Sequence, residues 1–220
     1  AADGSWQQLN SFQYGARAGM FYFQIGSKCF AGGGTNGSTF YNDFYEYFPA
    51  TDSWQPKAPL PMIGLAYGVG FAINGKGYAG IGQSSNASAG NAFFEYDPAS
   101  NSWTQKTTFP GVERTLAIGV SCNGKGYVGT GDAFANNLYL GDMWEYDPGN
   151  NSWTQKNGMP NNYSKSGAAS LIVNNKIIIT CGKDFQSFDT FEYNPQNDNW
   201  SIKNNYYCQF NSSSINSKGI

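Results

Sequence analysis

The chain has 220 residues, of which 17% are aromatic and only 13% are charged, and its formal net charge at pH 7 is -2. A charge this close to neutral, without a run of lysine or arginine, excludes the basic surface that nucleic-acid binding requires. No apolar stretch approaches the roughly 20 residues of a membrane-spanning helix, so we expect no membrane insertion. The chain also lacks histidine, which removes imidazole acid–base catalysis and the commonest copper and zinc ligand.

A short polar motif that ends in tryptophan opens the chain and then recurs at intervals of 47 to 50 residues. A fixed period of this size is typical of propellers and solenoids, in which each repeat buries its apolar face against its neighbours. The first copy, in residues 1–12, supplies only a lone outer strand. Because the tryptophans recur in every copy, we interpret them as scaffold: Trp6, Trp54, Trp103, Trp153 and Trp200.

Upstream of each later tryptophan, a two-residue turn separates two apolar runs. Asn-Gly is the favoured sequence, because a tight hairpin turn needs positive φ at both central residues. The first strands are expected at 66–73, 116–122 and 168–173, and the second strands carry glycines where another backbone must approach closely. The four turns are Gly26-Ser27, Asn74-Gly75, Asn123-Gly124 and Asn174-Asn175.

A third and a fourth strand flank a Glu-Tyr-x-Pro segment, because proline and the small polar residues after it form a turn. Its tyrosine stands seven residues before the tryptophan in four copies: Tyr47, Tyr96, Tyr146 and Tyr193. Each repeat therefore predicts a four-stranded antiparallel blade. The expected blades are 13–61, 62–110, 111–160 and 161–205, and residues 206–220 begin a fifth.

The Gly-rich second strand, the Tyr-Asp-Pro turn and the tryptophan seven residues after the tyrosine resemble the kelch repeat of secreted and surface proteins in bacteria. The resemblance implies an all-β fold, a kelch-type β-propeller with four complete blades and a partial fifth. An open ring leaves sheet edges unpaired. We therefore expect further blades or subunits to complete it, with the Trp6 strand and residues 214–220 flanking one incomplete blade. The alternative is a compact ring of four blades.

Loops that differ between repeats lie on one face of such a propeller, since strands alternate in direction. Variable loops on a rigid scaffold commonly carry function. We expect this face to bind a ligand through loop side chains that combine aromatic rings with a carboxylate: Phe40, Tyr41, Asp132, Phe134, Tyr139 and Phe185.

Basic residues recur where the first strand begins, at the expected channel mouth. They are Arg17, Arg114 and Lys165, with Glu113 beside Arg114 and Leu65 at the same position of the second blade. Guanidinium groups beside aromatic loops suit sugars, carboxylates or peptides. The alternative is structural, because kelch repeats often keep a basic residue here for hydrogen bonds between blades.

Two sets of residues, one of glutamates and one of aspartates with a single asparagine, recur at fixed repeat positions, which favours a structural role. Glutamates on different blades lie too far apart for the roughly 5 to 9.5 Å carboxylate pair of glycoside hydrolysis. We expect a second set to cap loops rather than bind calcium, so neither a metal nor a cofactor is predicted. The two sets are Glu46, Glu95, Glu145 and Glu192, and Asp43, Asn91, Asp142 and Asp189.

The four cysteines stand at different phases of the repeat, which favours small buried thiols over a disulfide framework. One pair, Cys181 and Cys208, is left open, because the two can meet across a blade interface in an oxidising compartment. The other cysteines are Cys29 and Cys122.

Together these features favour a non-enzymatic recognition module of an extracellular or cell-surface protein, which binds a glycan or a protein through its variable loops. One alternative is an enzyme resembling the kelch-type sialic acid mutarotases, in which Arg and Glu transfer protons without histidine. Another is a structural unit of a larger surface assembly, completed by strand addition from another chain.

Overall fold

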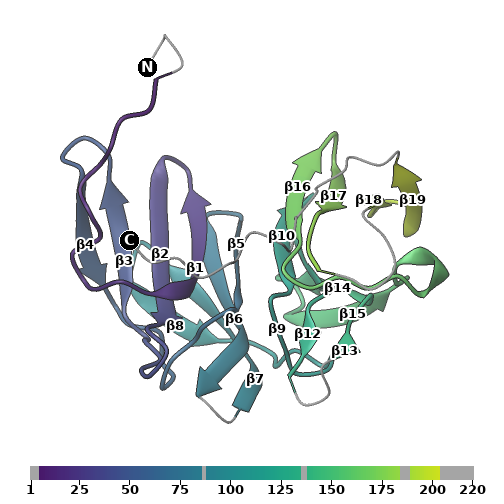
Figure 1. Ribbon diagram of the computed structural model, residues 1–220, viewed down its shortest axis with the longest axis horizontal. Coiled ribbons are helices and arrows are strands. Elements are labelled where there is room, and N and C mark those ends of the chain that lie inside the picture. The colour runs from purple at the N-terminus through teal and green to yellow at the C-terminus, as the bar shows by residue number, and fades with distance from the viewer. Residues whose placement is uncertain (1–4, 86–87, 135–137, 184–188, 204–220) are drawn as a thin grey trace, which may run out of the picture.

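The computed structural model describes residues 5–85, 88–134, 138–183 and 189–203. These residues form an all-β fold whose main elements are four sheets, each with four antiparallel strands in sequence order (Figure 1). Blade 1 contains β1 (Ala18–Ile25), β2 (Lys28–Thr35), β3 (Phe44–Phe48) and β4 (Ser53–Lys57), and blade 2 contains β5 (Val69–Ile73), β6 (Lys76–Ser85), β7 (Ser88–Asp97) and β8 (Ser102–Gln105). Blade 3 contains β10 (Ile118–Cys122), β11 (Lys125–Gly129), β14 (Met143–Asp147) and β15 (Ser152–Lys156), and blade 4 contains β16 (Ala169–Val173), β17 (Lys176–Thr180), β18 (Thr190–Asn194) and β19 (Asn199–Lys203).

The expected hairpin turns are confirmed. In blade 2 the turn residues Asn74 and Gly75 both have positive φ, 49° and 79°, and Asn123 and Gly124 repeat this in blade 3. Asparagine and glycine tolerate this conformation better than other residues, which explains their recurrence at the turn. The first strands begin later than expected, at Val69 in blade 2 and Ile118 in blade 3.

Two shorter elements lie outside the four blades. A three-stranded sheet combines β9 (Arg114–Thr115), β12 (Asp132–Ala133) and β13 (Leu138–Tyr139), in the order β13-β12-β9. A single 3-10 turn, η1 (Pro160–Asn162), lies in the segment that links blade 3 to blade 4. The strands β12 and β13 belong to the connection between the second and third strands of blade 3, β9 belongs to the linker before blade 3, and η1 belongs to the linker after it.

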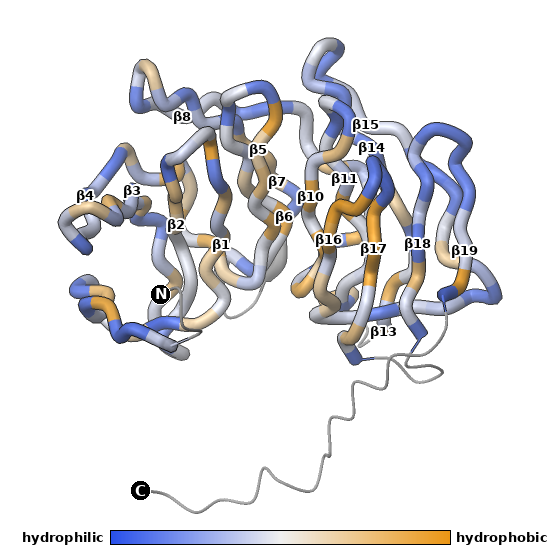
Figure 2. The backbone as a smooth tube through the Cα atoms, turned by 90° about the horizontal axis from the view of Figure 1, so that it is seen from above, coloured by the Kyte–Doolittle hydropathy of each residue, from blue (hydrophilic) through white to orange (hydrophobic). Residues whose placement is uncertain are grey.

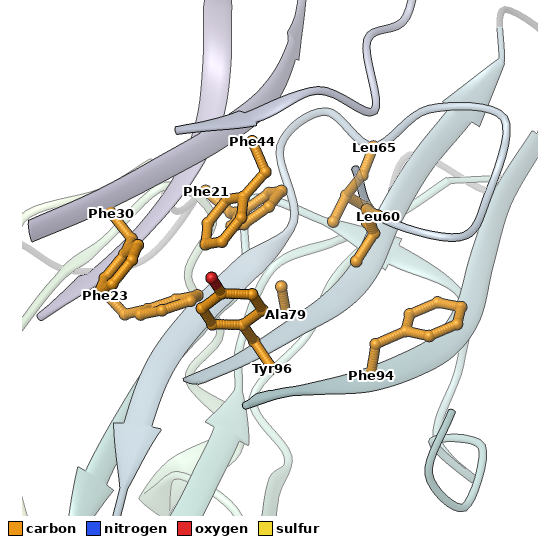
Figure 3. Packing of buried hydrophobic residues seen from close by; sticks show 9 residues of the cluster. All are labelled: Phe21, Phe23, Phe30, Phe44, Leu60, Leu65, Ala79, Phe94 and Tyr96. Carbon is orange, nitrogen blue, oxygen red and sulfur yellow. The ribbon is translucent and has the colours of Figure 1, made fainter. Parts of the chain in front are cut away.

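The blades stand side by side in chain order, with β1, β5, β10 and β16 as neighbouring innermost strands and the outer strands β4 and β19 at opposite ends (Figure 2). An apolar cluster fills each junction between consecutive blades. At the first junction Phe21, Phe23 and Phe44 of blade 1 face Tyr96 and Ala79 of blade 2 (Figure 3). Such interfaces between consecutive repeats are the usual basis of stability in repeat proteins.

Three of the five repeated tryptophans, Trp103, Trp153 and Trp200, belong to these junctions, as their scaffold interpretation requires. Trp103 makes edge contacts with Phe21 and Phe44 of the preceding blade, and its indole nitrogen donates a 2.9 Å hydrogen bond to the Ala58 carbonyl. The indoles of later blades make the same bond, Trp153 to Thr107 and Trp200 to Asn157.

A second repeated contact, here called the blade clamp, ties the outer edges of neighbouring blades. Its acceptor is an Asp or Asn side chain two residues before a tryptophan, and its donor is the backbone amide four residues after the preceding tryptophan. The same acceptor residue takes a 2.8 Å hydrogen bond from the repeated tyrosine of its own blade. The clamps pair Asn10 with Asp52, Ala58 with Asn101, Thr107 with Asn151 and Asn157 with Asp198.

The first clamp shows that the N-terminal segment occupies the position of a blade-to-blade linker. Beyond Asn10, Phe12 packs its ring against Tyr45 and Trp54 on the outer face of blade 1. Phe12 stands six residues after a tryptophan, as do the buried Leu60 and its counterparts in later linkers. Trp6 itself is fully exposed. Residues 214–220, the other expected flank of an incomplete blade, lie outside the described residues.

The opposite end of the stack has an uncovered apolar face, here called the open face of blade 4 and defined by Leu171 and Val173. These side chains are 55% and 49% exposed, whereas Phe71 and Ile73, at the same positions of blade 2, are 4% and 3% exposed. Among the described residues no apolar cluster joins blade 4 to blade 1. The described blades therefore do not close a ring by themselves, and completion by further blades or subunits stays a prediction.

The cysteines divide into two kinds. Cys29 and Cys122 are free thiols, and burial raises the pKa of Cys122, as expected for small apolar side chains. Cys181 is disulfide-bonded, which agrees with the pairing that the sequence left open for this residue, although its partner is not among the described residues. Cys181 directly follows β17 and has a positive φ of 59°. Cys208, the partner considered for it, lies outside the described residues.

Candidate functional site

The variable loops gather at one end of the sheets, here called the loop face, which bears the tip of the β6–β7 hairpin and the β12–β13 pair (Figure 1). The linkers between blades reach this face as well, because they run from the outer strand of one blade to the innermost strand of the next. Leu65 and Lys165, at the ends of two linkers, hydrogen-bond through their amides to the Tyr41 and Leu140 carbonyls of second-to-third loops. The loop face is therefore built from second-to-third loops that are hydrogen-bonded to the linkers between blades.

The basic residues of the expected channel mouth point into their own blades. Arg114 is fully buried and forms a bidentate pair with Asp142, with nitrogen–oxygen distances of 2.5 and 2.6 Å. Its remaining donors reach the carbonyls of Val112 and Thr130, and its guanidinium lies 5.0 Å from the Phe109 ring centre. A guanidinium engaged on every side is typical of a structural ion pair.

A similar arrangement recurs in blade 1, with one hydrogen bond to the carboxylate in place of two and with no hydrogen-bond partner for Arg17 Nε among the described residues. Arg17 pairs with Asp43 at 2.5 Å, donates to the Tyr14 carbonyl, and lies 3.9 Å from the centre of the Tyr41 ring. Lys165 of blade 4 is also fully buried, with its ammonium 5.5 Å from the Phe191 ring centre. Burial and pairing favour the structural alternative for these basic residues, whereas their role in ligand binding stays a prediction.

These pairs also explain the repeated acidic position, which we expected to cap loops. Asp43 and Asp142 instead accept hydrogen bonds from the basic residue of the same blade, with Asp142 also accepting from the Trp144 indole nitrogen. Blade 2, which has Leu65 in place of the basic residue, carries the neutral Asn91, whose amide donates to the Gly111 carbonyl. In blades 1 and 3 a basic residue at the start of the first strand is thus paired with an aspartate, whereas blade 2 has a neutral residue at both positions.

The structure separates the expected loop side chains. Tyr41 lies against Arg17, and Phe40 borders Gly64 of the next linker, where an added Cβ would approach the Phe40 backbone to 2.7 Å. Glu113 is exposed, and its carbonyl accepts from the amide of Phe134. Tyr139 and Asp132 are register partners in the three-stranded sheet. Phe185 lies outside the described residues.

A pocket of about 470 Å³ opens on the loop face where blade 3 meets the linker to blade 4. Aromatic side chains stand beside an amide, a hydroxyl and a thioether, and Asp142 brings its ion pair with Arg114 to the wall. The lining residues are Leu138, Tyr139, Gly141, Asp142, Gly158, Met159, Asn162, Tyr163 and Ser164.

Local backbone geometry shapes this pocket. Asn161 and Asn162 have positive φ, 56° and 58°, which reverses the chain within η1, and asparagine tolerates this conformation well. The Tyr163 carbonyl would lie 2.0 Å from a Cβ at Gly141, so only glycine allows the linker to approach the loop. Tyr163 also packs its ring 5.2 Å from Phe191 of blade 4, which fixes one wall.

A cation lies at the edge of this site. The Lys183 ammonium donates a hydrogen bond to the Tyr139 side chain and lies 5.6 Å from its ring centre. This hydrogen bond and the nearby Asp132 carboxylate raise the pKa of Lys183, so the side chain stays protonated at neutral pH. A cationic hydrogen-bond donor, Lys183, and a carboxylate, Asp132, therefore lie close together at the edge of the site, although neither lines the pocket.

Sequence reasoning named Tyr139 but missed the linker residues Met159, Asn162, Tyr163 and Ser164. A signal for them is the Asn161-Asn162 pair after Pro160, which indicates a tight reversal in this linker. Within the described parts of the chain, no group of three or more Cys, Asp or Glu side chains is placed to hold a metal ion. Those parts also contain no helix long and apolar enough to cross a membrane.

No protein-family model matches the sequence, and no curated protein matches it either. Among solved structures, that of YjhT resembles this chain with a TM-score of 0.73 and 16% sequence identity, over 87% of this chain and 66% of YjhT. The chain thus spans just under two thirds of the length of YjhT. At this identity the likeness shows the fold alone, and it supports the arrangement of these four-stranded sheets as blades of a β-propeller.

Proposed function

We propose that this chain is a kelch-type, non-enzymatic recognition module of an extracellular or cell-surface protein, and that it binds a glycan in the loop-face pocket. The observation that carries the proposal is the pocket itself, of about 470 Å³. Tyrosine rings such as Tyr139 and Tyr163 offer flat apolar surfaces, and Asn162 and Ser164 offer hydrogen bonds to hydroxyl groups. Such a combination of an apolar wall with a few polar groups is typical of small-molecule sites.

Two further observations support the proposal. The ion pairs with Asp43 and Asp142 hold the guanidinium groups of Arg17 and Arg114, which counts against proton transfer by these groups at the mouth. The disulfide at Cys181 supports an oxidising, extracellular location, because disulfides are rare in reducing compartments.

The test is a glycan-array screen of the protein, followed by titration of the bound glycan against pocket variants. Asn162→Gly keeps the positive φ but removes the amide, and Ser164→Ala removes the hydroxyl. Each variant is expected to weaken binding about tenfold, corresponding to one lost hydrogen bond of about 1.4 kcal/mol. Gln105→Ala, on the exposed outer strand β8, is the control and is expected to bind normally. Unchanged binding by both pocket variants would contradict the proposal.

A second candidate, a sugar mutarotase like the kelch-type sialic acid mutarotases, is favoured by one observation. Opening a cyclic hemiacetal needs a proton donor at the ring oxygen and a base at the anomeric hydroxyl, and Lys183 and Asp132 are groups of these two kinds. The measurement is the rate of exchange between sugar anomers, with sialic acid among the sugars tested, followed by NMR. Acceleration that disappears in Lys183→Met would favour this candidate.

A further inference from the structure

Each blade has a residue with left-handed backbone conformation at the same repeat position, within β1 in blade 1 and just before the first strand in blades 2, 3 and 4. The φ values are 67° at Gly19, 55° at Tyr67, 56° at Leu116 and 63° at Gly167. At this position each blade binds the previous one through the backbone: the amide of Tyr67 donates to the Gly19 carbonyl, that of Leu116 to Tyr67, and that of Gly167 to Leu116, at 2.8 to 2.9 Å. The junctions therefore require positive φ here, and glycine satisfies this requirement without strain.

Blades 2 and 3 place large side chains at this strained position, and burial does not account for them. A second repeat position, in or just after the second strand, also holds non-glycine residues with positive φ, namely Ile81 and Thr130. These two residues are buried, with exposed fractions of 1% and 0%. Leu116, by contrast, is 41% exposed and Tyr67 only half-buried. Neither backbone preference nor core packing explains leucine at position 116, and strain of this kind gathers at functional sites.

The surroundings leave room for a ligand beside these side chains. The Tyr67 ring lies over Gly19, where an added Cβ would approach it to 2.7 Å. On the side of blade 4, no described atom lies within 4 Å of a Cβ built on Gly167. An aromatic ring and an exposed aliphatic side chain thus stand on successive blades, next to open space.

The short three-stranded sheet connects this position to the loop-face pocket. Leu116 directly follows β9, in which Thr115 pairs with Asp132 of β12, and Asp132 pairs with Tyr139 of β13, a lining residue of the pocket. Neighbouring strands are about 4.8 Å apart, so two steps across the sheet cover about 10 Å. A ligand that reaches from the pocket to Leu116 must therefore be longer than one sugar ring.

The charges along this path disfavour an acidic ligand. Asp142 is paired with Arg114, Asp132 lies close to Lys183, and Glu113 presents an exposed carboxylate beside the path. The first two carboxylates each have a cation beside them and add no net charge, whereas the Glu113 carboxylate makes the path negative and repels an anionic sugar. A neutral ligand fits this surface better.

We infer that the pocket is one end of an extended site for a neutral oligosaccharide, whose chain runs along the β9–β12–β13 sheet and ends against Leu116 and Tyr67. This inference rests on the proposed function, because it assigns the ligand class and length to the same site. Leu116 and Tyr67 are specificity-determining residues for chain length. Their contacts with the bound oligosaccharide are the reason that these side chains stand where glycine would avoid backbone strain.

The experiment titrates series of neutral oligosaccharides of one to four units, built from glucose, N-acetylglucosamine and xylose, against wild type and Leu116→Gly. Wild type is expected to bind longer chains at least tenfold more tightly than the single sugar, and Leu116→Gly is expected to lose most of this gain. The melting temperature of Leu116→Gly is expected to equal or exceed that of wild type, since glycine relieves strain at positive φ. Leu171→Gly, at an exposed leucine of β16 on the open face of blade 4, is the matched control. It is expected to melt at a lower temperature than wild type and to bind every oligosaccharide as wild type does.

The outcomes separate the two proposals. If wild type binds single sugars and longer chains equally well, or if Leu116→Gly keeps the full gain with length, the extended site is wrong while glycan binding stands. If wild type binds no member of any series but binds another glycan on the array, the extended site is wrong while the proposed function stands, and if it binds no glycan at all, both fail. A melting temperature of Leu116→Gly as low as that of Leu171→Gly assigns Leu116 to the scaffold and overturns the inference.

Discussion

The amide of Asn10 donates a 2.6 Å hydrogen bond to the Asp52 carboxylate, in the same place where Ala58 binds Asn101 at the next junction. The N-terminal segment thus makes the contact of a blade-to-blade linker although Trp6, just before it, packs against nothing described. Ala58 makes its contact from the segment that follows the outer strand of blade 1, and Asn10 makes the equivalent contact to blade 1 itself. The N-terminal segment is part of the scaffold and not a loose tail.

Removing a clamp acceptor should destabilise its junction. Asn101→Gly keeps the positive φ of this residue, 50°, but leaves the amide of Ala58 and the hydroxyl of Tyr96 without their acceptor. We expect a loss of about 2 kcal/mol in the free energy of unfolding, measured by urea denaturation. Asp52→Gly should in addition release the N-terminal segment and speed its proteolysis. Equal cleavage of this segment in both variants would contradict the role given to Asn10.

The repeated tryptophans should differ in their contribution to stability according to burial. Trp103→Ala removes the ring that contacts Phe21 and Phe44 and the hydrogen bond to Ala58, so we expect it to cost about 3 kcal/mol without a specific effect on binding. Trp6→Ala is the matched control, because its indole is fully exposed, and should change stability by less than about 0.5 kcal/mol. Urea unfolding monitored by circular dichroism gives both values. A larger loss for Trp6 would show that its indole is covered in solution.

The Arg114–Asp142 pair should act as scaffold. Arg114→Met leaves the Asp142 carboxylate without its bidentate partner, and we expect a loss of about 3 kcal/mol in the free energy of unfolding. The double variant Arg114→Met with Asp142→Asn removes the stranded charge and should recover part of this loss, which a double-mutant cycle measures. If instead Arg114→Lys keeps full stability but loses glycan binding, the guanidinium is a ligand-binding group.

Stability should fall at alkaline pH because the repeated tyrosines are buried. Burial, assisted by the nearby charges of Glu46 and Asp97, raises the pKa of Tyr96 from 10.0 to about 12. Since the folded pKa lies above the unfolded one, this stabilisation is complete below pH 10 and is lost as the pH rises from about 10 to about 12. Urea midpoints across this range give the slope. Tyr96→Phe, which cannot ionise, should show a shallower loss, and an identical slope would contradict this assignment.

Thiol labelling tests the state of the cysteines. In denatured but unreduced protein, a maleimide should modify Cys29 and Cys122 and leave Cys181 unmodified until a reductant is added. Peptide mapping by mass spectrometry reads each site separately. Labelling of Cys181 before reduction would show that its disulfide is absent, and would remove one support for an extracellular location.

The repeat explains how much of this fold is predictable from sequence. Turn residues such as Asn123-Gly124 and the Tyr146–Trp153 spacing carry local conformational signals, so strand order and blade number follow from them. The site depends on contacts that these signals do not report. The aspartate that pairs with Arg114 stands 28 residues later and recurs like a scaffold residue, and the inward direction of the guanidinium appears only in three dimensions. The only sequence signal for positive φ at Leu116 is the glycine at the same repeat position in blades 1 and 4, Gly19 and Gly167, because leucine itself rarely adopts this conformation.

The blade clamp also determines how the molecule comes apart. Each clamp, like each apolar cluster, joins only two adjacent blades, so the free energy of the array is close to a sum of nearest-neighbour terms, as in a one-dimensional chain of coupled units. Blade 4 has one such neighbour among the described residues, and the Leu171 side of its sheet has none. Among the described residues, breaking the junction between blades 3 and 4 therefore releases blade 4 while the other junctions remain. The loop-face pocket, which spans blade 3 and the linker to blade 4, lies at this junction, so a ligand bound there would hold blade 4 in place.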